Sequence, residues 1–453
     1  MNSIPGMRNQ TVVDLRIDAD WIVPVEPAGK VLEHHSLIVG EGRIQDILPS
    51  HEADSRYLFR ERVRLPGHAL IPGLVNLHGH AAMALLRGYA DDLPLMSWLN
   101  EHIWPAEARW MSPEFVMDGS RLACLEMLKG GVTCFNDMYF FQDATIEAAL
   151  EAKMRVASGI IVIDFPSAWA ADPDGYLQKG MEVRDAYRHQ PLVSFCLAPH
   201  APYSCADKTL EKVQTYAAQL DLPIHMHIHE THDEIRHSLD TYRLRPLERL
   251  HQLGLLGPQF IGVHAVHLGD EEILLLAEQG CHVAHCPSSN LKLANGVAPK
   301  TRLLEAGVNI GIGTDGAASN NRLDVFEEMR LAALLAKGMS GRADVVPAHA
   351  ALAMATLNGA RALGLDGQIG SLLPGKQADI VAVDLSGASM QPCYDPISQV
   401  VYSAGREQVR HVWVAGEMVV KDGRCLSIDE AHLVRHARQW RERIASGSRP
   451  TGG

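Results

Sequence analysis

The chain has 453 residues, of which 47% are hydrophobic and 21% are charged, as in a globular protein with a large core. Its formal net charge of −13 argues against nucleic acid or an anionic membrane as the main partner. The sequence has neither a leader with a basic and then an apolar region nor an apolar run of roughly 18 residues, so we expect a cytoplasmic protein.

The two ends of the chain share one pattern. Residues 11–68 alternate short apolar runs with turn signals, which predicts short antiparallel strands. Residues 378–421 repeat this pattern, and a helix is expected over 428–446. We therefore expect residues 1–68 and 369–453 to form one small β-sandwich domain, with the closing helix in its second part.

Between these ends, short apolar strands alternate with helical stretches, which is typical of repeated βα units around a parallel sheet. Eight strands are expected, over 69–77, 132–138, 155–163, 193–199, 223–229, 260–265, 282–287 and 309–315. Eight such units over residues 69–368 predict a (β/α)8 TIM-like barrel. A doubly wound open sheet is the alternative that the pattern leaves open.

Metal-ligand side chains gather at the ends of the expected strands. His78 and His80 are one residue apart on a strand, so both imidazoles point the same way and can form half of a metal site. Further candidates end the later strands: His200, His225, His227, His229, Glu230, His264, His267, His285 and Asp315. Because the chemistry of such barrels lies at the carboxyl ends of the strands, the pattern predicts a metal site on that rim.

Five ordered motifs carry a resemblance to a known family. They are residues 72–80 (PGLVNLHGH), 225–231 (HMHIHET), 262–268 (GVHAVHL), 284–293 (AHCPSSNLKL) and 312–317 (IGTDGA). Together they resemble the mononuclear-metal aminohydrolase branch of the amidohydrolase superfamily. Three loop motifs at 90–99, 104–109 and 198–204 are similar to the 5′-methylthioadenosine/S-adenosylhomocysteine deaminase family.

The resemblance implies a set of ligands and catalytic residues. His78, His80, His227 and Asp315 would bind one divalent metal, expected to be zinc, although Fe²⁺ or Mn²⁺ suits the same donors. Spacing alone cannot choose among the three histidines of the fifth strand, and the resemblance selects His227 because the ligand precedes the glutamate by three residues. Glu230 would then be the proton shuttle, and His264, favoured over His267, would hydrogen-bond the attacking water, with Asp315 as the base.

For the substrate, the resemblance implies contacts from Glu107, His200 and Trp98, together with Glu230 and Asp315. The expected reaction is zinc-dependent hydrolytic deamination of a 5′-substituted adenosine. Relatives that accept S-adenosylhomocysteine can hold its carboxylate with arginines after the third strand, whereas residues 156–183 contain no arginine. We therefore expect 5′-methylthioadenosine to be preferred over S-adenosylhomocysteine.

Three other functions are considered. The same scaffold could act on a free base or a triazine, such as guanine, 8-oxoguanine, cytosine or a chlorotriazine. A binuclear hydrolase would need a lysine at the end of the fourth strand, and residues 193–205 contain none. A non-catalytic scaffold is a remote alternative, because all the implied ligands are present. The resemblance also implies a homo-oligomer, either a dimer or a tetramer.

Overall fold

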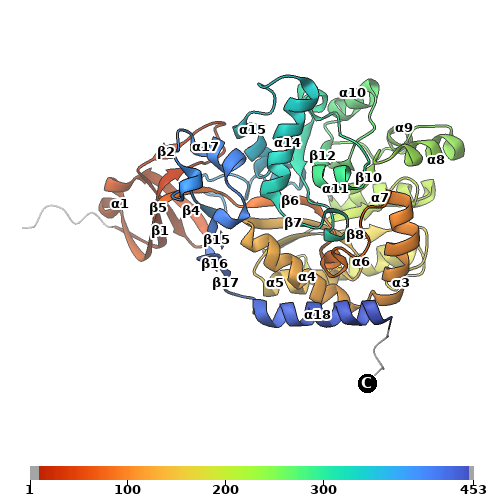
Figure 1. Cartoon of the computed structure of the whole chain (residues 1–453), viewed down its shortest axis with the longest axis horizontal. Coiled ribbons are helices and arrows are strands. Elements are labelled where there is room, and N and C mark those ends of the chain that lie inside the picture. Colours follow the sequence, from red (N-terminus) through yellow and green to blue (C-terminus); the bar gives the residue numbers. More distant parts are fainter. Residues whose placement is uncertain (1–9, 448–453) are drawn as a thin grey trace, which may run out of the picture.

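The computed structural model describes residues 10–447, which contain two β-sheets (Figure 1). The barrel sheet has eight parallel strands paired in chain order. These are β6 (Leu74–Gly79), β7 (Val132–Tyr139), β8 (Arg155–Val162), β9 (Val193–Pro199), β10 (Ile224–Ile228), β11 (Phe260–His264), β12 (His282–His285) and β13 (Asn309–Ile312).

The barrel closes where its last strand meets its first. The backbone N–H groups of Thr314 and Asp315, just after β13, donate hydrogen bonds to the carbonyl of His78 at 3.1 and 3.0 Å. The prediction of a (β/α)8 barrel is therefore confirmed, and the doubly wound sheet is excluded. This closure also brings Asp315 beside His78, although 237 positions of the numbering separate them.

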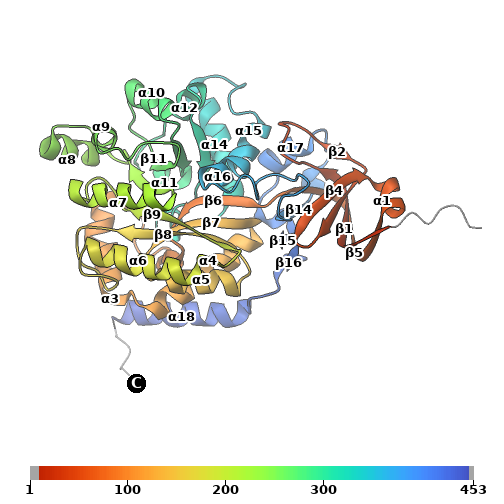
Figure 2. The ribbon, with the colours of Figure 1, turned by 180° about the vertical axis from the view of Figure 1, so that it is seen from behind.

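Helices surround the barrel strands on the outside (Figures 1 and 2). They include α4 (Pro113–Lys129), α5 (Gln142–Glu151), α6 (Pro173–Tyr187), α7 (Asp207–Leu220), α8 (His232–Tyr242), α9 (Pro246–Gln252), α10 (Asp270–Glu278), α12 (Lys300–Glu305), α14 (Val325–Ser340), α15 (Ala348–Met354) and α16 (Leu357–Ala362). The short helices α11 (Pro287–Lys292) and α13 (Ala317–Asn320) lie instead at the carboxyl end of the barrel, where each gives a serine hydroxyl to Asp315. Side-chain caps begin several of them; Asp172 before α6, for example, accepts the N–H of Gly175 at 2.8 Å. Between residues 10 and 447, no helix combines the length and apolarity needed to cross a membrane.

The terminal sheet combines strands from both ends of the chain. It contains β1 (Thr11–Ile22), β2 (Leu32–Glu33), β3 (His35–Gly40), β4 (Arg43–Pro49), β5 (Tyr57–Pro72), β14 (Ile380–Asp384), β15 (Val409–Val414), β16 (Glu417–Lys421) and β17 (Arg424–Cys425). The expected separate sheet from the terminal segments is confirmed. The domain limits at residues 68 and 369 stay a prediction.

One strand direction in this sheet differs from the expectation. All the pairs are antiparallel except β1 and β5, which run parallel. The prediction of only antiparallel strands over 11–68 is wrong because a short helix, α1 (Ser50–Arg56), follows β4. This crossover returns the chain in the direction of β1, whereas a tight turn would have reversed it.

The expected strand 69–77 is divided between the two sheets. β5 ends at Pro72 and β6 begins at Leu74, so Gly73 alone lies between them. A Cβ at Gly73 would lie 2.0 Å from Oγ1 of Thr133, so a larger residue does not fit here. The strand that leads to His78 is thus continuous with the terminal sheet.

The C-terminal helix α18 (Glu430–Ser446) lies along α4 on the outside of the barrel (Figure 1). Its Trp440 packs edge-on against Phe115 of α4, with ring centroids 5.3 Å apart, and its Nε1 donates to Oδ2 of Asp118 at 2.9 Å. The helix expected over 428–446 is therefore present and anchored through one buried tryptophan.

The segment between β6 and α4 covers the carboxyl end of the barrel. It is built from short helices: the 3-10 helix η1 (Ala81–Leu86), α2 (Leu95–Ser97), the π-helix η2 (Trp98–Ile103) and α3 (Trp104–Trp110). Side chains from all four line the cavity described next. Single turns of π-helix are rare and are frequent at functional sites.

Candidate active site

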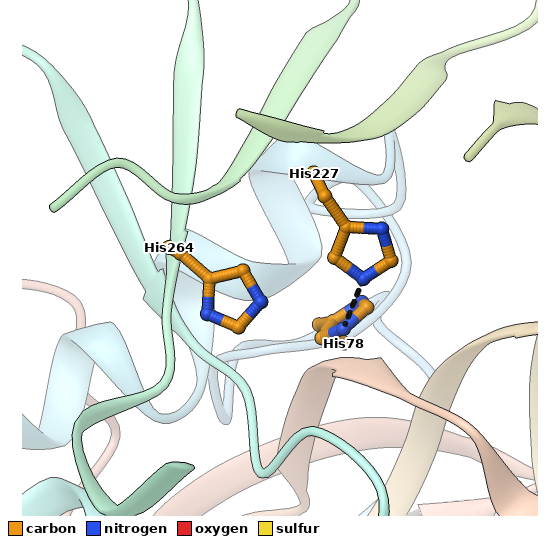
Figure 3. Close-up of side chains that lie close together, drawn as sticks. All are labelled: His78, His227 and His264. Atoms are coloured by element: carbon orange, nitrogen blue, oxygen red, sulfur yellow. Dashed lines mark hydrogen bonds between the residues drawn. The ribbon is translucent and has the colours of Figure 1, made fainter. Parts of the chain in front are cut away.

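Four side chains from three places in the chain converge at the carboxyl end of the barrel. The Nε2 atoms of His78 and His227 are 3.2 Å apart (Figure 3), and Oδ1 of Asp315 lies 3.3 Å from Nε2 of His78 and 3.2 Å from Nε2 of His80. Ligand atoms around a tetrahedral zinc ion lie roughly 3.3 Å apart, given zinc–nitrogen distances of about 2.0–2.1 Å. His78, His80 and Asp315 therefore have the spacing of a metal site, and His227 adjoins them through its contact with Nε2 of His78.

The far side of each imidazole ring is held by another group. Nδ1 of His80 donates to the carbonyl of Met138 at 2.6 Å, and Nδ1 of His227 donates to the carbonyl of His200 at 2.8 Å. Nδ1 of His78 shares a hydrogen bond with Nε2 of His225 at 3.0 Å. Such partners fix the orientation and tautomer of metal-binding histidines.

These tautomers require a cation in the centre of the group. A neutral His80 that donates through Nδ1 presents a lone pair on Nε2, and this lone pair faces a carboxylate oxygen of Asp315. Burial lowers the pKa of His80, but the hydrogen bond and charge of Asp315 outweigh burial and raise this pKa to about 9. Either a proton or a metal ion thus has to lie between the two groups, and the donor set fits a divalent ion.

Asp315 is itself rigidly placed. Its backbone has a left-handed φ of 61°, which is strained for a residue other than glycine and occurs at functional sites. Oδ2 accepts hydrogen bonds from the hydroxyls of Ser289 (2.5 Å) and Ser319 (2.8 Å), so Oδ1 is the oxygen that faces the histidines. Burial raises its pKa, but hydrogen bonds from His78 and His80 outweigh burial and hold the pKa well below the usual range.

Glu230 lies beside this group, just past β10. Its Oε1 accepts a hydrogen bond from Nδ2 of Asn295 at 2.8 Å and lies 3.6 Å from Nε2 of His264. Burial raises the pKa of Glu230, which favours a carboxyl that carries a proton. The buried carboxyl of Glu234 accepts the backbone N–H groups of His229 and Glu230 at 2.8 and 2.9 Å, and so fixes the turn that aims Glu230.

His264 completes the polar end of the site (Figure 3). Its Nδ1 donates to Oδ1 of Asn290 at 2.8 Å, which leaves Nε2 directed toward Glu230. His78, His227 and His264 also form a second close group of possible metal ligands that shares two members with the predicted set. His264 can therefore hydrogen-bond a molecule held at the same point.

A cavity of about 310 Å³ opens from this polar end. Glu107, His200 and Trp98, the three other predicted site residues, all line it. Burial raises the pKa of Glu107 to about 7, and the hydroxyl of Tyr139 donates to its Oε1 at 2.6 Å. The apolar part of the wall includes Met83, Leu95, Leu99, Trp104, Met111 and Phe140.

Other histidines at the strand ends lie outside the ligand group. His229 donates to the carbonyl of His267 at 3.2 Å and accepts the N–H of Leu247 at 3.1 Å, so its ring points away. The ring of His267 packs on His232, with centroids 3.8 Å apart. His285 is buried, and neither of its ring nitrogens has a hydrogen-bond partner among residues 10–447.

Three residues that hold candidate site residues in place were not among the predicted ones: Tyr139, Asn295 and Glu234. Tyr139 had a usable signal, because it ends a barrel strand and shares its direction with Asp137, two residues earlier. Asn295 had none, since an asparagine in a loop is most often a turn residue.

Comparisons with known proteins agree with this geometry. Residues 69–419 match the Amidohydrolase family, and the chain belongs to that family. It is a metal-dependent aminohydrolase, as the sequence motifs predicted.

Three similar proteins stand out. A 5-methylthioadenosine/S-adenosylhomocysteine deaminase of Teredinibacter turnerae is 48% identical over 97% of this chain and 100% of its own length. The crystal structure of an adenosine deaminase from Xanthomonas campestris with bound zinc has a TM-score of 0.95 and 48% identity, covering 96% of this chain and 100% of that one. Zinc-bound atrazine chlorohydrolase from Arthrobacter aurescens has a TM-score of 0.87 at 25% identity, over 94% and 99% of the two chains.

Proposed function

We propose that this enzyme hydrolytically deaminates 5′-substituted adenosines, with one zinc ion per subunit and a preference for 5′-methylthioadenosine over S-adenosylhomocysteine. One observation carries the proposal: three of the four candidate ligands line the same cavity as Glu230 and Glu107, namely His80, His227 and Asp315. A deaminase needs an activated water, a proton donor and a sugar contact within the length of one nucleoside.

The metal is proposed from the donor set. Three imidazoles and one carboxylate form a ligand set that suits zinc and leaves one position open for water. Iron or manganese would tolerate the same set. Burial lowers the pKa of His78 to about 4 and that of His227 well below its ordinary value, so both rings are neutral donors. When bound, a divalent ion supplies the Lewis acidity that makes water a nucleophile near neutral pH.

The protein's own groups then move the protons. Asp315 takes a proton from the water as it adds to C6 of the purine, and Glu230 gives its proton to the neighbouring ring nitrogen. His264, whose ring is held by Asn290, accepts a hydrogen bond from the water through Nε2 and stabilises the tetrahedral centre. Asp315 finally gives its proton to the amino group, which leaves as ammonia, while the hydroxyl on C6 returns its proton to Glu230 and becomes the carbonyl oxygen of the product.

The sugar contacts are proposed from the other predicted site residues that line the cavity. Glu107 presents a carboxyl that can accept hydrogen bonds from the hydroxyl groups of a sugar. The ring of His200 is held in place through Nδ1, which lies 3.0 Å from the hydroxyl oxygen of Ser204. Trp98, which is 5% exposed, offers an apolar face to the base or to the 5′-group. The substrate would therefore be a nucleoside and not a free base.

The preference between 5′-substituents is proposed from charge. Among the described residues that line the cavity, none is a lysine or an arginine. Lys179, the cation nearest in sequence to the expected position, donates to the carbonyl of Trp169 at 2.6 Å and lies over that indole ring. A small apolar methylthio group suits this wall better than an amino-acid carboxylate does.

The test is ammonia release by zinc-loaded enzyme from 5′-methylthioadenosine, S-adenosylhomocysteine, adenosine, adenine, guanine, cytosine and atrazine, measured side by side. We expect activity with the adenosines alone, and the highest kcat/KM with the methylthio compound. Turnover of a free base or of the triazine in place of the adenosines would refute the nucleoside assignment. Equal or better kcat/KM with S-adenosylhomocysteine would refute only the preference.

A second assay addresses the metal. Enzyme stripped with a chelator should lose activity and regain it with Zn²⁺, and full recovery with Fe²⁺ or Mn²⁺ alone would assign another ion. The cytoplasmic location and the dimer or tetramer stay predictions alongside this proposal.

A further inference from the structure

We propose that Tyr139 is a positioning residue that holds Glu107 so that a single carboxylate oxygen is presented to the ribose hydroxyls. The inference rests on the proposed function, because it needs Glu107 to contact the sugar. It adds a residue that acts through Glu107 and sets the enzyme's preference for ribonucleosides over deoxynucleosides.

The contact between the two side chains is short and buried. The Tyr139 hydroxyl donates to Oε1 of Glu107 at 2.6 Å, and Tyr139 and Glu107 are 2% and 8% exposed. Within residues 10–447, the hydrogen bond of the Glu107 carboxyl to Tyr139 uses Oε1, and Oε2 has no protein donor. Because Glu107 lines the cavity, its unused acceptor capacity is available to a ligand.

Tyr139 is well suited to fix this carboxyl. It is the last residue of β7, its ring packs edge-on against Phe140 with centroids 5.4 Å apart, and its carbonyl accepts Nε2 of Gln142 at 3.2 Å. A tyrosine held on a strand end has few alternative rotamers, whereas the longer Glu107 side chain on α3 has more freedom of its own.

The same strand end also positions the ligand group. The carbonyl of Met138 accepts Nδ1 of His80, and the Asp137 carboxylate accepts the N–H of Ala81 at 2.7 Å. Three successive residues of β7 thus fix a ligand, the backbone after it and the sugar contact. The distance between the reacting carbon and the ribose is thereby set by one rigid element.

The consequence is specificity for hydroxyl groups. A carboxylate oxygen held at one point accepts a hydrogen bond from a correctly placed ribose hydroxyl. A deoxy analogue lacks this hydroxyl, so the buried carboxylate oxygen stays unpaired in its complex and the analogue binds more weakly. Without Tyr139, the Glu107 carboxylate can rotate, so the bond to the ribose weakens while the chemistry at C6 is untouched.

The experiment compares Tyr139→Phe, Glu107→Gln and the double variant on adenosine and on 2′,3′-dideoxyadenosine. For Tyr139→Phe we expect kcat/KM for adenosine to fall about tenfold, mainly through KM, and kcat/KM for the dideoxy compound to change less than about twofold. In the Glu107→Gln background, removing the Tyr139 hydroxyl should have no further effect on adenosine, since the two residues act as one unit.

Tyr187→Phe is the matched control. Its hydroxyl donates to Oε1 of Glu147 at 2.8 Å, the same type of bond on the outside of the barrel, and neither residue lines the cavity. This variant should leave the ratio of kcat/KM for the two substrates unchanged. If Tyr139→Phe does not fold, 3-fluorotyrosine at position 139 alters the donor strength within the same ring, and the ratio should again change.

The outcomes separate the two proposals. Wild-type enzyme that releases no ammonia from any adenosine refutes the proposed function. Active wild type, with equal losses on adenosine and dideoxyadenosine in Tyr139→Phe or additive losses in the double variant, refutes only the role of Tyr139.

Discussion

Replacing Glu230 with glutamine preserves the shape of the side chain and removes its ability to exchange a proton. The glutamine oxygen can still accept Nδ2 of Asn295, which lies 2.8 Å from Oε1 in the wild type. Substrate binding and folding should therefore change little, with KM altered less than about threefold. General acid–base catalysis contributes about 10²–10⁴-fold, and burial raises the pKa of Glu230, the carboxyl proposed to protonate the ring nitrogen.

We therefore expect kcat to fall by about 10³–10⁴-fold, equivalent to roughly 4–5.5 kcal/mol of activation free energy. The assay is steady-state ammonia release from 5′-methylthioadenosine, with zinc content and thermal unfolding measured on the same samples. Glu248→Gln, the same change at an exposed position of α9, is the control and should retain full activity. A loss of less than tenfold in a folded, zinc-loaded Glu230→Gln enzyme would show that another group delivers the proton.

Three further predictions concern the metal and the stability of the fold. His227→Ala should abolish stoichiometric zinc binding after dialysis, whereas His225→Ala should only weaken it, by about 10–100-fold; equal zinc content in both variants would contradict this ligand assignment. Burial raises the pKa of Glu328 to about 8 in the folded protein, from an ordinary value of 4.5. The protonated side chain therefore gives its full contribution to stability below pH 4.5, and this contribution is lost as the pH rises toward 8. Relative to Glu328→Gln, wild type should lose about 2 kcal/mol of unfolding free energy between pH 6 and pH 8 in urea titrations, and a constant difference would refute this. Arg155 donates two hydrogen bonds to the buried carboxylate of Asp379, at 2.8 and 3.0 Å. Arg155→Met should therefore lower the free energy of unfolding by about 3–5 kcal/mol, and adding Asp379→Leu should restore part of this loss. If the losses of the two single variants simply add in the double variant, the two residues do not act as a pair.

The barrel was readable from the sequence because its strands are buried on both faces and therefore appear as short, continuous apolar runs. The break between β5 and β6 at Gly73 could not be predicted from the sequence, because the apolar pattern continues through it. A glycine is required there because Thr133, which is distant in the sequence, packs against Gly73 in the folded structure. The parallel pairing of β1 and β5 was missed because periodicity identifies a strand without giving its partner's direction.

In the site, the rule that residues i and i+2 share a direction selected His78 and His80, and Asp315 was a candidate because it ends the eighth expected strand. The resemblance supplied His227 and Glu230, which spacing alone could not separate from their neighbours. Asn290 and Asn295 could not be predicted because their roles depend on loops folding back toward His264 and Glu230. Such contacts arise from tertiary packing and leave no local pattern.

The pairing of β5 with β14 has a consequence for synthesis on the ribosome. β5 lies between β1 and β14 in the terminal sheet, and its residues 68–72 pair with residues 380–384. At about 5–20 residues per second, the second partner is translated roughly 15–60 s after the first. During that interval the nascent chain carries the apolar segment from Ala69 to Ile71 with one edge open, which makes β5 the place where a chaperone would protect the growing protein.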